Sequence, residues 1–366
     1  MMTRQTTAVK APAIAIATYQ SVPVIGLGTY APPSFTQRET LAALGLEGNA
    51  FAEEILANAG IATRNFSIPP VEIFRDTSLG RQASYFREHA PRMAAEALRR
   101  AAGTTIELAT IDAVVTATSS GYMMPGLSEV LCGRYGIGRP DGLRYDLVGH
   151  GCLAMLPAVQ MGRALIASNQ AKRVAVVCSE PQAAMYNPTD SSKTTIVQNM
   201  IFGEGAAALI LQGHSEGDQH LPAFLDFEQE LAPETLETVG VKQGNVWEST
   251  LDRSVPEIVG RILPGVIERL LGRHALRLAD VSHWAFHTGG RRVLEVSQQG
   301  LGLSDAQMAP SYEVLRRHGN MGSGTVIHSL AEVLSSSRPA PGELGLLVSV
   351  GPGMVIGAAL VCWEGN

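Results

Sequence analysis

The chain has 366 residues, of which 45% are hydrophobic and 17% charged, and it contains 38 glycines. This composition excludes a disordered chain, and the length predicts two domains or two large halves rather than one core. The net charge of −6 and the lack of any basic cluster larger than an arginine pair argue against a nucleic-acid partner.

The cysteines and the N-terminus indicate where the protein works. Four cysteines are widely spaced, without a CxxC motif or a Cys/His metal-ligand spacing, so we expect reduced thiols, no metal and a cytoplasmic location. The N-terminus lacks a charged segment followed by an apolar core and a cleavage site. No apolar run reaches the ~18 residues that cross a membrane, so we expect no membrane partner. The cysteines are Cys132, Cys152, Cys178 and Cys362.

In the first half, strand-like and helix-like patterns alternate after a loose tail at 1–10. Apolar β-type runs fill 11–30, and Ser34 or Thr36 is a candidate cap for a helix that continues to Leu44. A polar, glycine-containing stretch at 213–220 predicts a boundary, which gives halves 1–215 and 216–366. Helices are predicted at 49–59, 84–102, from the loop 119–126 to about Tyr135, and at 153–168; strands are predicted at 111–118, 143–148 and 173–179.

The second half repeats this alternation, which predicts an α/β fold in which helices cover mixed sheets. His150-Gly151-Cys152 has an echo in His318-Gly319-Asn320, and the FGEG stretch at 202–205 has one in VGPG at 350–353. Two echoes in the same order predict a duplicated chain, although the spacing between them differs. Helices are predicted at 255–272, 290–300, 304–317 and 325–336; strands are predicted at 281–287, 344–350 and 354–363.

Cys152 is the first candidate for chemistry. It follows a short strand and two glycines, and it precedes the almost wholly apolar stretch 153–168, which is typical of a buried helix. The free N–H groups and the positive dipole end of such a helix favour a thiolate, which is the nucleophilic form of cysteine. The alternative is a small buried cysteine that only fills the core.

A nucleophilic cysteine needs a base, and the best-placed histidine is His287, which ends a predicted buried strand and precedes two glycines. If the halves pack around a pseudo-twofold axis, Asn320 faces Cys152. The alternatives are a histidine bonded to main chain and a helix-capping asparagine. The repeat predicts structural roles for His150 and His318, and His283 lies deeper in its strand.

Gly351 and Gly353 flank a proline between two predicted strands. Their N–H groups could supply one arm of an oxyanion hole, with the N–H of Cys152 as the other. The alternative is a tight turn in a two-strand ribbon.

Taken together, the chain resembles the type III polyketide synthases, the chalcone synthase-like branch of the thiolase superfamily. Seven stretches keep the family's order and approximate spacing over most of the chain. They are MPGLSEVL at 124–131, HGCLAMLPAVQMGRALI at 150–166, RVAVVCSE at 173–180, IVQNMIFGEGAAALIL at 196–211, WAFHTGGRRVLEV at 284–296, RHGNMGSG at 317–324 and VGPGM at 350–354.

The resemblance implies a thiolase-like fold of two pseudo-symmetric halves, each with a mixed sheet, layered αβαβα. It implies a catalytic triad of Cys152, His287 and Asn320, with Phe202 shielding the cysteine and Met124 reaching into the cavity of the partner subunit. It further implies a homodimer that condenses malonyl-CoA, with or without another acyl-CoA, and needs no metal or redox cofactor.

Several positions depart from the family pattern. The stretch 51–58 lacks the basic residues found near the coenzyme A entrance, and Arg64 keeps the family's basic position. Ser249 stands where a second shielding aromatic is expected, Met185 replaces a small polar cavity residue, and Gly322 replaces a serine. The cavity is therefore expected to differ from that of a chalcone-forming enzyme.

The stretch at 55–70 is similar to the bacterial subfamily that makes 3,5-dihydroxyphenylacetyl-CoA from malonyl-CoA alone. Two alternatives stay open: a ketoacyl synthase III-like single condensation or acyl transfer with an acyl carrier protein, and a catalytically silent thioester-binding member. A hydrolase is disfavoured because no water-positioning carboxylate is evident; Glu180 and Glu204 are expected to be structural.

Overall fold

The computed structural model describes residues 21–363 apart from 74–77, 188–189, 214–220 and 244–246. Its main feature is one nine-stranded sheet, in the order β11-β12-β13-β8-β1-β7-β6-β4-β5. The first half supplies five of these strands. They are β1 (Val22–Tyr30), β4 (Ala113–Ala117), β5 (Leu143–Leu147), β6 (Arg173–Glu180) and β7 (Gly205–Gln212).

The second half repeats the strand pattern of the first. In each half a parallel pair (β4 with β6, β11 with β12) is followed by two antiparallel pairings (β6-β7-β1 and β12-β13-β8). This repetition confirms the prediction of two pseudo-symmetric halves. The second-half strands are β8 (Ala223–Leu231), β11 (His283–Phe286), β12 (Leu344–Gly351) and β13 (Val355–Cys362).

The two half-sheets are joined rather than separate, which the sequence did not predict. β1 pairs with β7 along most of its length, but its first residues turn to β8, where Val22 faces Phe224 and Pro23 faces Ala223. The predicted boundary falls mainly on 214–220, outside the described residues.

The strands bury both faces, and alternate residues contribute to different cores. In β4, Val114 packs in the core beneath α4 and α5, whereas Val115 packs in the central core that contains α6 and α11. In β12, Leu346 and Leu347 divide in the same way between the outer core, which contains α8, and the central core.

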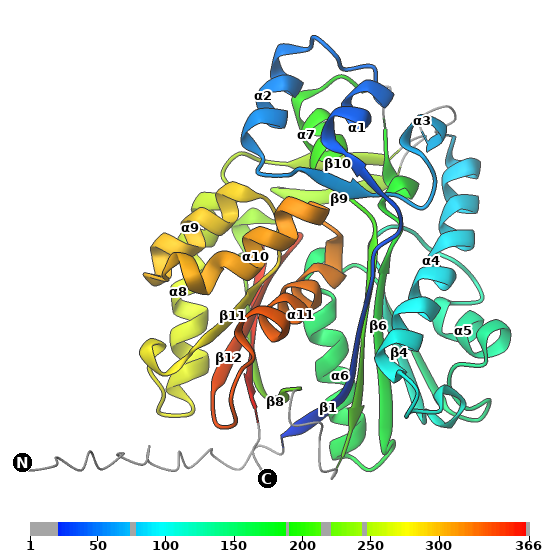
Figure 1. Cartoon of the computed structure of the whole chain (residues 1–366), viewed down its shortest axis with the longest axis vertical. Helices are drawn as coiled ribbons and strands as arrows, with labels where there is room; N and C mark the ends of the chain where they lie inside the picture. The colour runs from blue at the N-terminus through cyan, green and yellow to red at the C-terminus, as the bar shows by residue number, and fades with distance from the viewer. Residues whose placement is uncertain (1–20, 74–77, 188–189, 214–220, 244–246, 364–366) are drawn as a thin grey trace, which may run out of the picture.

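The layers are therefore α4 and α5, the first half-sheet, α6 and α11, the second half-sheet, and α8 to α10 (Figure 1). This arrangement confirms the expected αβαβα order. The helices are α4 (Leu79–Ala102), α5 (Leu127–Tyr135), α6 (Met155–Ala167), α8 (Val255–Gly272), α9 (Arg291–Leu301), α10 (Asp305–His318) and α11 (Thr325–Ser337).

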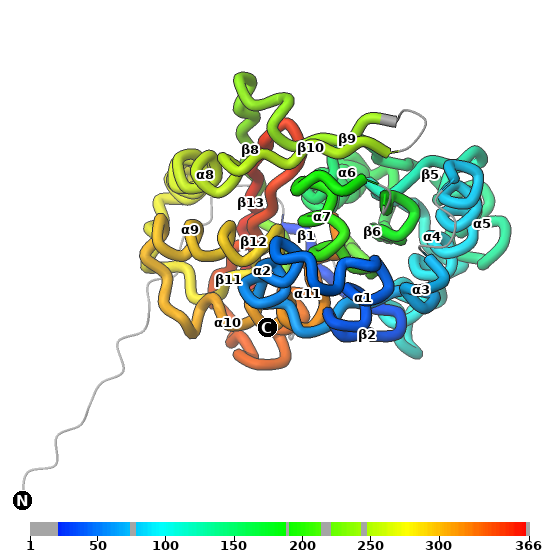
Figure 2. The backbone as a smooth tube through the Cα atoms, turned by 90° about the horizontal axis from the view of Figure 1, so that it is seen from above, coloured from blue at the N-terminus to red at the C-terminus, as the bar shows by residue number. Residues whose placement is uncertain are grey.

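Smaller elements gather over one end of the layers, as Figures 1 and 2 show. Thr36 rather than Ser34 caps α1, through a capping box with Glu39. None of the described helices is long and apolar enough to cross a bilayer. The elements are α1 (Gln37–Ala43), α2 (Ala50–Asn58), α3 (Pro70–Ile73), α7 (Lys193–Ile201), β2 (Ser34–Thr36), β3 (Thr63–Asn65), β9 (Val239–Gln243) and β10 (Trp247–Leu251).

Candidate functional site

Cys152 lies in a 3₁₀ turn, Gly151–Leu153, that leads into α6. The expected helix start is therefore displaced by a short turn. Gly151 has φ = 52°, and a Cβ there would lie 2.3 Å from Cδ of Pro352, so only glycine fits without a shift. Ser349 on β12 donates a hydrogen bond of 2.8 Å to the Cys152 carbonyl. The second half thus holds the turn that carries the thiol.

Asn320 lies in the equivalent position before α11. Gly319 has φ = 66°, and a Cβ there would lie 2.5 Å from the Ile201 carbonyl oxygen. The Asn320 N–H donates to Ile201 and its carbonyl accepts from Gly203, both at 2.9 Å, so the chain around Phe202 holds it. Oδ1 of Asn320 accepts from the Gly322 N–H at 2.9 Å, which fixes the orientation of the amide.

His287 continues β11, and its N–H donates to the Val348 carbonyl at 2.8 Å. Thr288, the next residue, donates from Oγ1 to the Gly319 carbonyl at 2.7 Å, which ties this strand end to the Asn320 turn. The imidazole is buried and interacts with the Gly322 backbone. Nδ1 of His287 has no hydrogen-bond partner among the described residues.

The structure therefore gathers the three residues around the loop 319–322. The amide of Asn320 bonds to the thiol of Cys152, while His287 meets the same loop at Gly322. No direct hydrogen bond joins Cys152 to His287 in the described part of the chain.

Burial disfavours the charged forms of both reacting groups. Burial raises the pKa of Cys152 to about 12, and the Glu180 carboxylate adds to this shift, while the bond from Asn320 opposes it. Burial also lowers the pKa of His287 to about 4. In both groups the loss of hydration of the charged form is the largest cause of the shift.

Glu180 ends β6 beside this site and is fully buried. Its carboxylate accepts hydrogen bonds from the backbone and hydroxyl of Ser119 and from the hydroxyls of Ser120 and Ser323. Burial raises its pKa, which these bonds oppose. The network connects the start of the 119–126 loop to the turn before α11. That Glu180 lies this close to the thiol was not predicted from the sequence.

A partly open pocket with about 430 Å³ of empty volume adjoins the site. Phe202 lines this pocket, and its backbone forms a β-bridge with Asn320. The pocket is therefore next to the cluster of Cys152, His287 and Asn320. Met185 and Ser249, both predicted cavity residues, line it as well. The lining residues are Gln182, Met185, Tyr186, Asn187, Thr195, Gln198, Asn199, Phe202, Val241, Trp247 and Ser249.

Arg64 does not lie at a coenzyme A entrance, because it is fully buried. Its Nη1 donates to the carbonyls of Asn199 and Phe202 at 2.6 and 2.7 Å, and its Nε donates to Gln37 at 2.6 Å. The guanidinium therefore holds the C-terminal carbonyls of α7, which carry the negative end of that helix dipole. Arg64 positions Phe202 rather than reaching a ligand in solvent.

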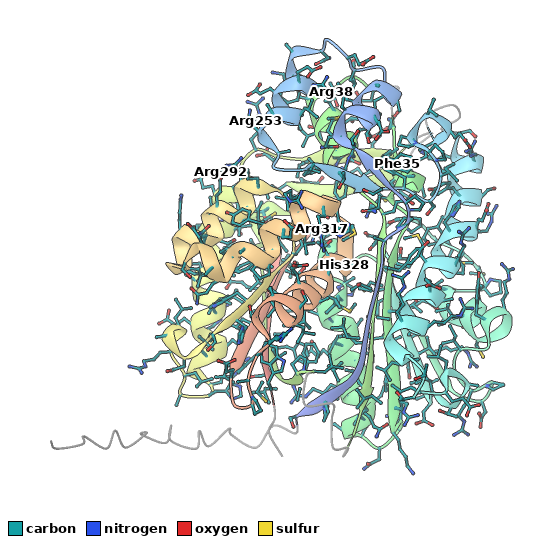
Figure 3. All side chains as sticks on the ribbon, viewed as in Figure 1. Phe35, Arg38, Arg253, Arg292, Arg317 and His328 are labelled. Carbon is teal, nitrogen blue, oxygen red and sulfur yellow. The ribbon has the colours of Figure 1, made fainter. Side chains whose placement is uncertain are left out.

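Basic side chains do occur on the outside of this end of the molecule. Figure 3 shows Arg38, Arg253 and Arg292 around α1, α2 and the start of α9. Arg38 pairs with Glu53 of α2 at 3.8 Å, and Arg292 pairs with Glu295 at 3.2 Å.

The glycine turn between β12 and β13 is not a free pair of donors. The N–H of Gly353 already donates to the Val239 carbonyl at 3.0 Å, so Gly353 cannot serve an oxyanion as expected. A Cβ on Gly351 would lie 2.8 Å from Cβ of Leu153, so Gly351 packs directly on the cysteine turn. The alternative reading as a tight turn fits these contacts.

The remaining residues singled out in the sequence lie outside the three-residue cluster. His318 and His283 bond to Asn65 and Glu343, both at 2.7 Å, whereas His150 is exposed. Met124 is 82% exposed, on the surface before α5. Glu204 is buried and binds Ser67, Tyr85 and Ala183, which is a structural role.

Comparisons with known proteins follow the two halves. Residues 63–215 match the family model "Chalcone and stilbene synthases, N-terminal domain". Residues 271–363 match "3-Oxoacyl-[acyl-carrier-protein (ACP)] synthase III C terminal".

Relatives match over nearly the whole chain. A 3,5-dihydroxyphenylacetyl-CoA synthase from Streptomyces toyocaensis is 32% identical over 93% of this chain and 90% of its own. One from Amycolatopsis orientalis is 31% identical over 92% of both chains. The crystal structure of 1,3,6,8-tetrahydroxynaphthalene synthase from Streptomyces coelicolor superposes with a TM-score of 0.86 at 22% identity, covering 94% of this chain and 100% of the other.

Proposed function

Because the chain belongs to the type III polyketide synthases, we propose that Cys152, His287 and Asn320 perform its condensations. Enzymes of this family transfer acyl groups from coenzyme A thioesters and form carbon–carbon bonds. The observation that carries the proposal is the convergence of the three side chains on the loop 319–322, beside a pocket. Their presence together also argues against a silent thioester-binding protein.

The first step loads the enzyme. The Cys152 sulfur attacks the thioester carbonyl of an acyl-CoA, and His287 takes the thiol proton as the C–S bond forms. Burial raises the pKa of Cys152 and lowers that of His287, so the thiolate forms only as His287 takes up the proton. Coenzyme A leaves with a proton returned by the imidazolium, and the acyl group stays on sulfur.

The second step makes the nucleophilic carbon. A malonyl-CoA loses CO₂, and the electron pair of the broken C–C bond becomes an enolate whose oxygen carries negative charge. Asn320 and the ring N–H of neutral His287 donate hydrogen bonds to that oxygen, where the charge develops. The enolate carbon then attacks the acyl-cysteine and displaces the thiolate, which lengthens the chain by two carbons.

The reaction needs no resident cofactor in this scheme, since the thioester and the carboxylate that leaves as CO₂ supply the driving force. In the described part of the chain, no group of three or more His, Cys, Asp or Glu side chains is arranged to hold a metal. The absence of a cofactor and the cytoplasmic location both remain predictions.

The product that the relatives' names favour is 3,5-dihydroxyphenylacetyl-CoA. The resemblance of residues 55–70 implies that malonyl-CoA is the only substrate. The purified protein should be incubated with malonyl-CoA, with and without a panel of acyl-CoA starters, and the products identified by mass spectrometry. We expect product from malonyl-CoA alone. Product formation only when a starter is added would contradict this assignment, though not the family.

A single condensation with an acyl carrier protein is a second candidate, which the match of residues 271–363 favours. The two are separated by supplying malonyl groups on coenzyme A or on a carrier protein. We expect turnover with the coenzyme A thioester. Turnover only with the carrier-bound substrate would establish the alternative.

A homodimer is also proposed. Tyr122, Met124 and Val148 are among the large apolar side chains that are more than half exposed, and β5 forms an open edge of the sheet close to Val148. Exposed apolar groups beside a free strand edge are typical of a protein–protein contact. Sedimentation should show a dimer, and Met124→Glu should shift it toward the monomer.

A further inference from the structure

Arg64 is a fully buried cation whose hydrogen-bond partners are all neutral. Its guanidinium bonds to the side chains of Gln37 and Tyr186 and to two backbone carbonyls, and its Nη2 has no partner among the described residues. Burial lowers the pKa of Arg64, because the cation loses hydration that neutral partners replace only in part. Proteins keep such costly groups chiefly at functional sites, so the setting of Arg64 points to a role beyond packing.

The guanidinium holds the end of α7. Its Nη1 donates to the carbonyls of Asn199 and Phe202 at 2.6 and 2.7 Å. Gln37 accepts from Nε at 2.6 Å and itself donates to the Met200 carbonyl at 2.7 Å. The last carbonyls of an α-helix have no partner within the helix, and here these two side chains supply partners for them. The path of the chain as it leaves α7 therefore depends on Arg64.

The residues that follow α7 are joined to the turn that carries Asn320. The Asn320 N–H donates to the Ile201 carbonyl, and the Asn320 carbonyl accepts from the Gly203 N–H, both at 2.9 Å. The two segments also pack closely, because a Cβ on Gly319 would lie 2.5 Å from the Ile201 carbonyl oxygen and 3.3 Å from Cγ and Cδ of Arg64. With contacts this close, a shift of the α7 end would move the backbone of Asn320 as well.

The amide of Asn320 moves with this backbone. Its Oδ1 accepts from the Gly322 N–H at 2.9 Å, which ties the side chain to its own loop, and the amide bonds to the thiol of Cys152. In the proposed reaction the same amide donates to the enolate oxygen. A misplacement of about 1 Å can cost about 10²-fold in rate, so a small displacement of this loop matters for decarboxylation.

We propose that Arg64 is a positioning residue for decarboxylation, which places the Asn320 amide through the backbone bonds between residues 201–203 and Asn320; the inference rests on the proposed function. Arg64 lies behind the site and is not among the residues that line the pocket. Acylation of Cys152 uses the thiol and His287, so it should depend on Arg64 much less than decarboxylation does.

The test compares Arg64→Met, which removes the donors and the charge, with Gln37→Met, which keeps the guanidinium and removes one of its partners. Thr63→Val is the matched control on the same strand, β3. Thr63 donates from Oγ1 to the Arg317 carbonyl at 2.7 Å, so this variant removes a bond to the end of a different helix, α10.

Two steps are measured in each folded protein. Acyl-enzyme is followed by intact mass after mixing with an acyl-CoA, and decarboxylation is followed as CO₂ released from malonyl-CoA labelled in the free carboxylate. Arg64→Met is also made in Asn320→Ala, because residues that act through each other are not additive. Urea unfolding reports the loss of stability separately.

We expect Arg64→Met to lower CO₂ release about tenfold to a hundredfold while acyl-enzyme formation changes by less than about threefold. Gln37→Met should act in the same direction and more weakly. Thr63→Val should leave the ratio of the two rates unchanged. In the Asn320→Ala background, Arg64→Met should lower CO₂ release by less than about threefold.

An unchanged ratio in folded Arg64→Met would overturn the inference, as would an equal change in Thr63→Val or a full further loss in the Asn320→Ala background. If Arg64→Met does not fold, an unchanged ratio in Gln37→Met overturns it and a lowered ratio supports it. Wild-type protein that neither forms acyl-enzyme nor releases CO₂ would instead refute the proposed function, and this inference with it.

Discussion

The turns before α6 and α11 are two versions of one structure. Each has a glycine at positive φ, a functional residue next to it, a 3₁₀ turn and then a helix buried between the half-sheets. They differ in what holds them: the Cys152 turn rests on the glycine turn after β12, whereas the Asn320 turn is bonded on both sides of Phe202. The two turns therefore share a backbone form but differ in their supporting contacts and in the side chain they present, so one turn offers a nucleophile and the other an amide.

Removing the amide tests the division of labour between the turns. Asn320→Ala should lower product formation by about 10²–10³, because one donor to the enolate oxygen is lost. Acylation of Cys152 should be affected much less. Steady-state rates and intact mass measure the two steps separately, and an equal loss in both would show that Asn320 does not act at decarboxylation.

Adding a methyl group to either glycine tests the shared support. Gly151→Ala and Gly319→Ala should each lower the free energy of unfolding by about 2–5 kcal/mol, since a left-handed alanine costs roughly 1–2 and the contacts force further shifts. Gly342→Ala is the control, because Gly342 has φ = +88° and open space around it. Urea unfolding should show a smaller loss there; equal losses in all three would mean that only backbone strain matters.

Acid should lower the free energy of unfolding, chiefly through three buried histidines of the second half. Burial lowers the pKa of His287 and His318 to about 4 and that of His328 to about 3. The unfolded chain takes up these protons from about pH 6.5 downward while the folded chain resists. Stability should therefore fall between pH 6.5 and 4, by up to about 1.4 kcal/mol per pH unit per histidine.

Replacing His328, which packs against β7 of the first half, tests this dependence of stability on pH. His328 contacts the Ala206 carbonyl through Nε2 at 3.1 Å, a bond that glutamine can also make. His328→Gln should flatten the pH dependence of urea unfolding, and the same change at exposed His150 should not. An unaltered slope in His328→Gln would exclude this residue as a source.

Glu180 provides the smallest test, on the cysteine side alone. Its charge raises the pKa of Cys152, so Glu180→Gln should lower that pKa and speed alkylation by iodoacetamide several-fold near pH 8. Asn320→Ala should slow alkylation, because its bond lowers the same pKa. The two variants should therefore change the alkylation rate in opposite directions. A slower reaction in Glu180→Gln would contradict the proposed effect of its charge on Cys152.

The sequence was sufficient for the layered core and for the candidate cluster. Strands such as β6 are apolar on both faces, so they stand out in the sequence as continuous apolar runs. The repeated motifs HGC and HGN predicted the two turns from the sequence alone. Three of the smaller elements over one end of the layers, β9, β10 and α7, were not predicted. They are short and mixed in polarity, so their packing depends on residues far along the chain.

The errors concern side chains whose setting is purely three-dimensional. Arg64 was expected among the substrate-binding residues, but it is buried and donates to carbonyls more than 130 residues away along the chain.

The central claim is that the turn before α6 carries the nucleophile. The most direct measurement is the mass of the intact protein, quenched rapidly after mixing with malonyl-CoA or an acyl-CoA, followed by peptide mapping. The account predicts an acyl adduct on the peptide that contains Cys152 and none on Cys152→Ala. An adduct on the variant, or one mapped to Cys132, Cys178 or Cys362 in the wild type, would contradict it.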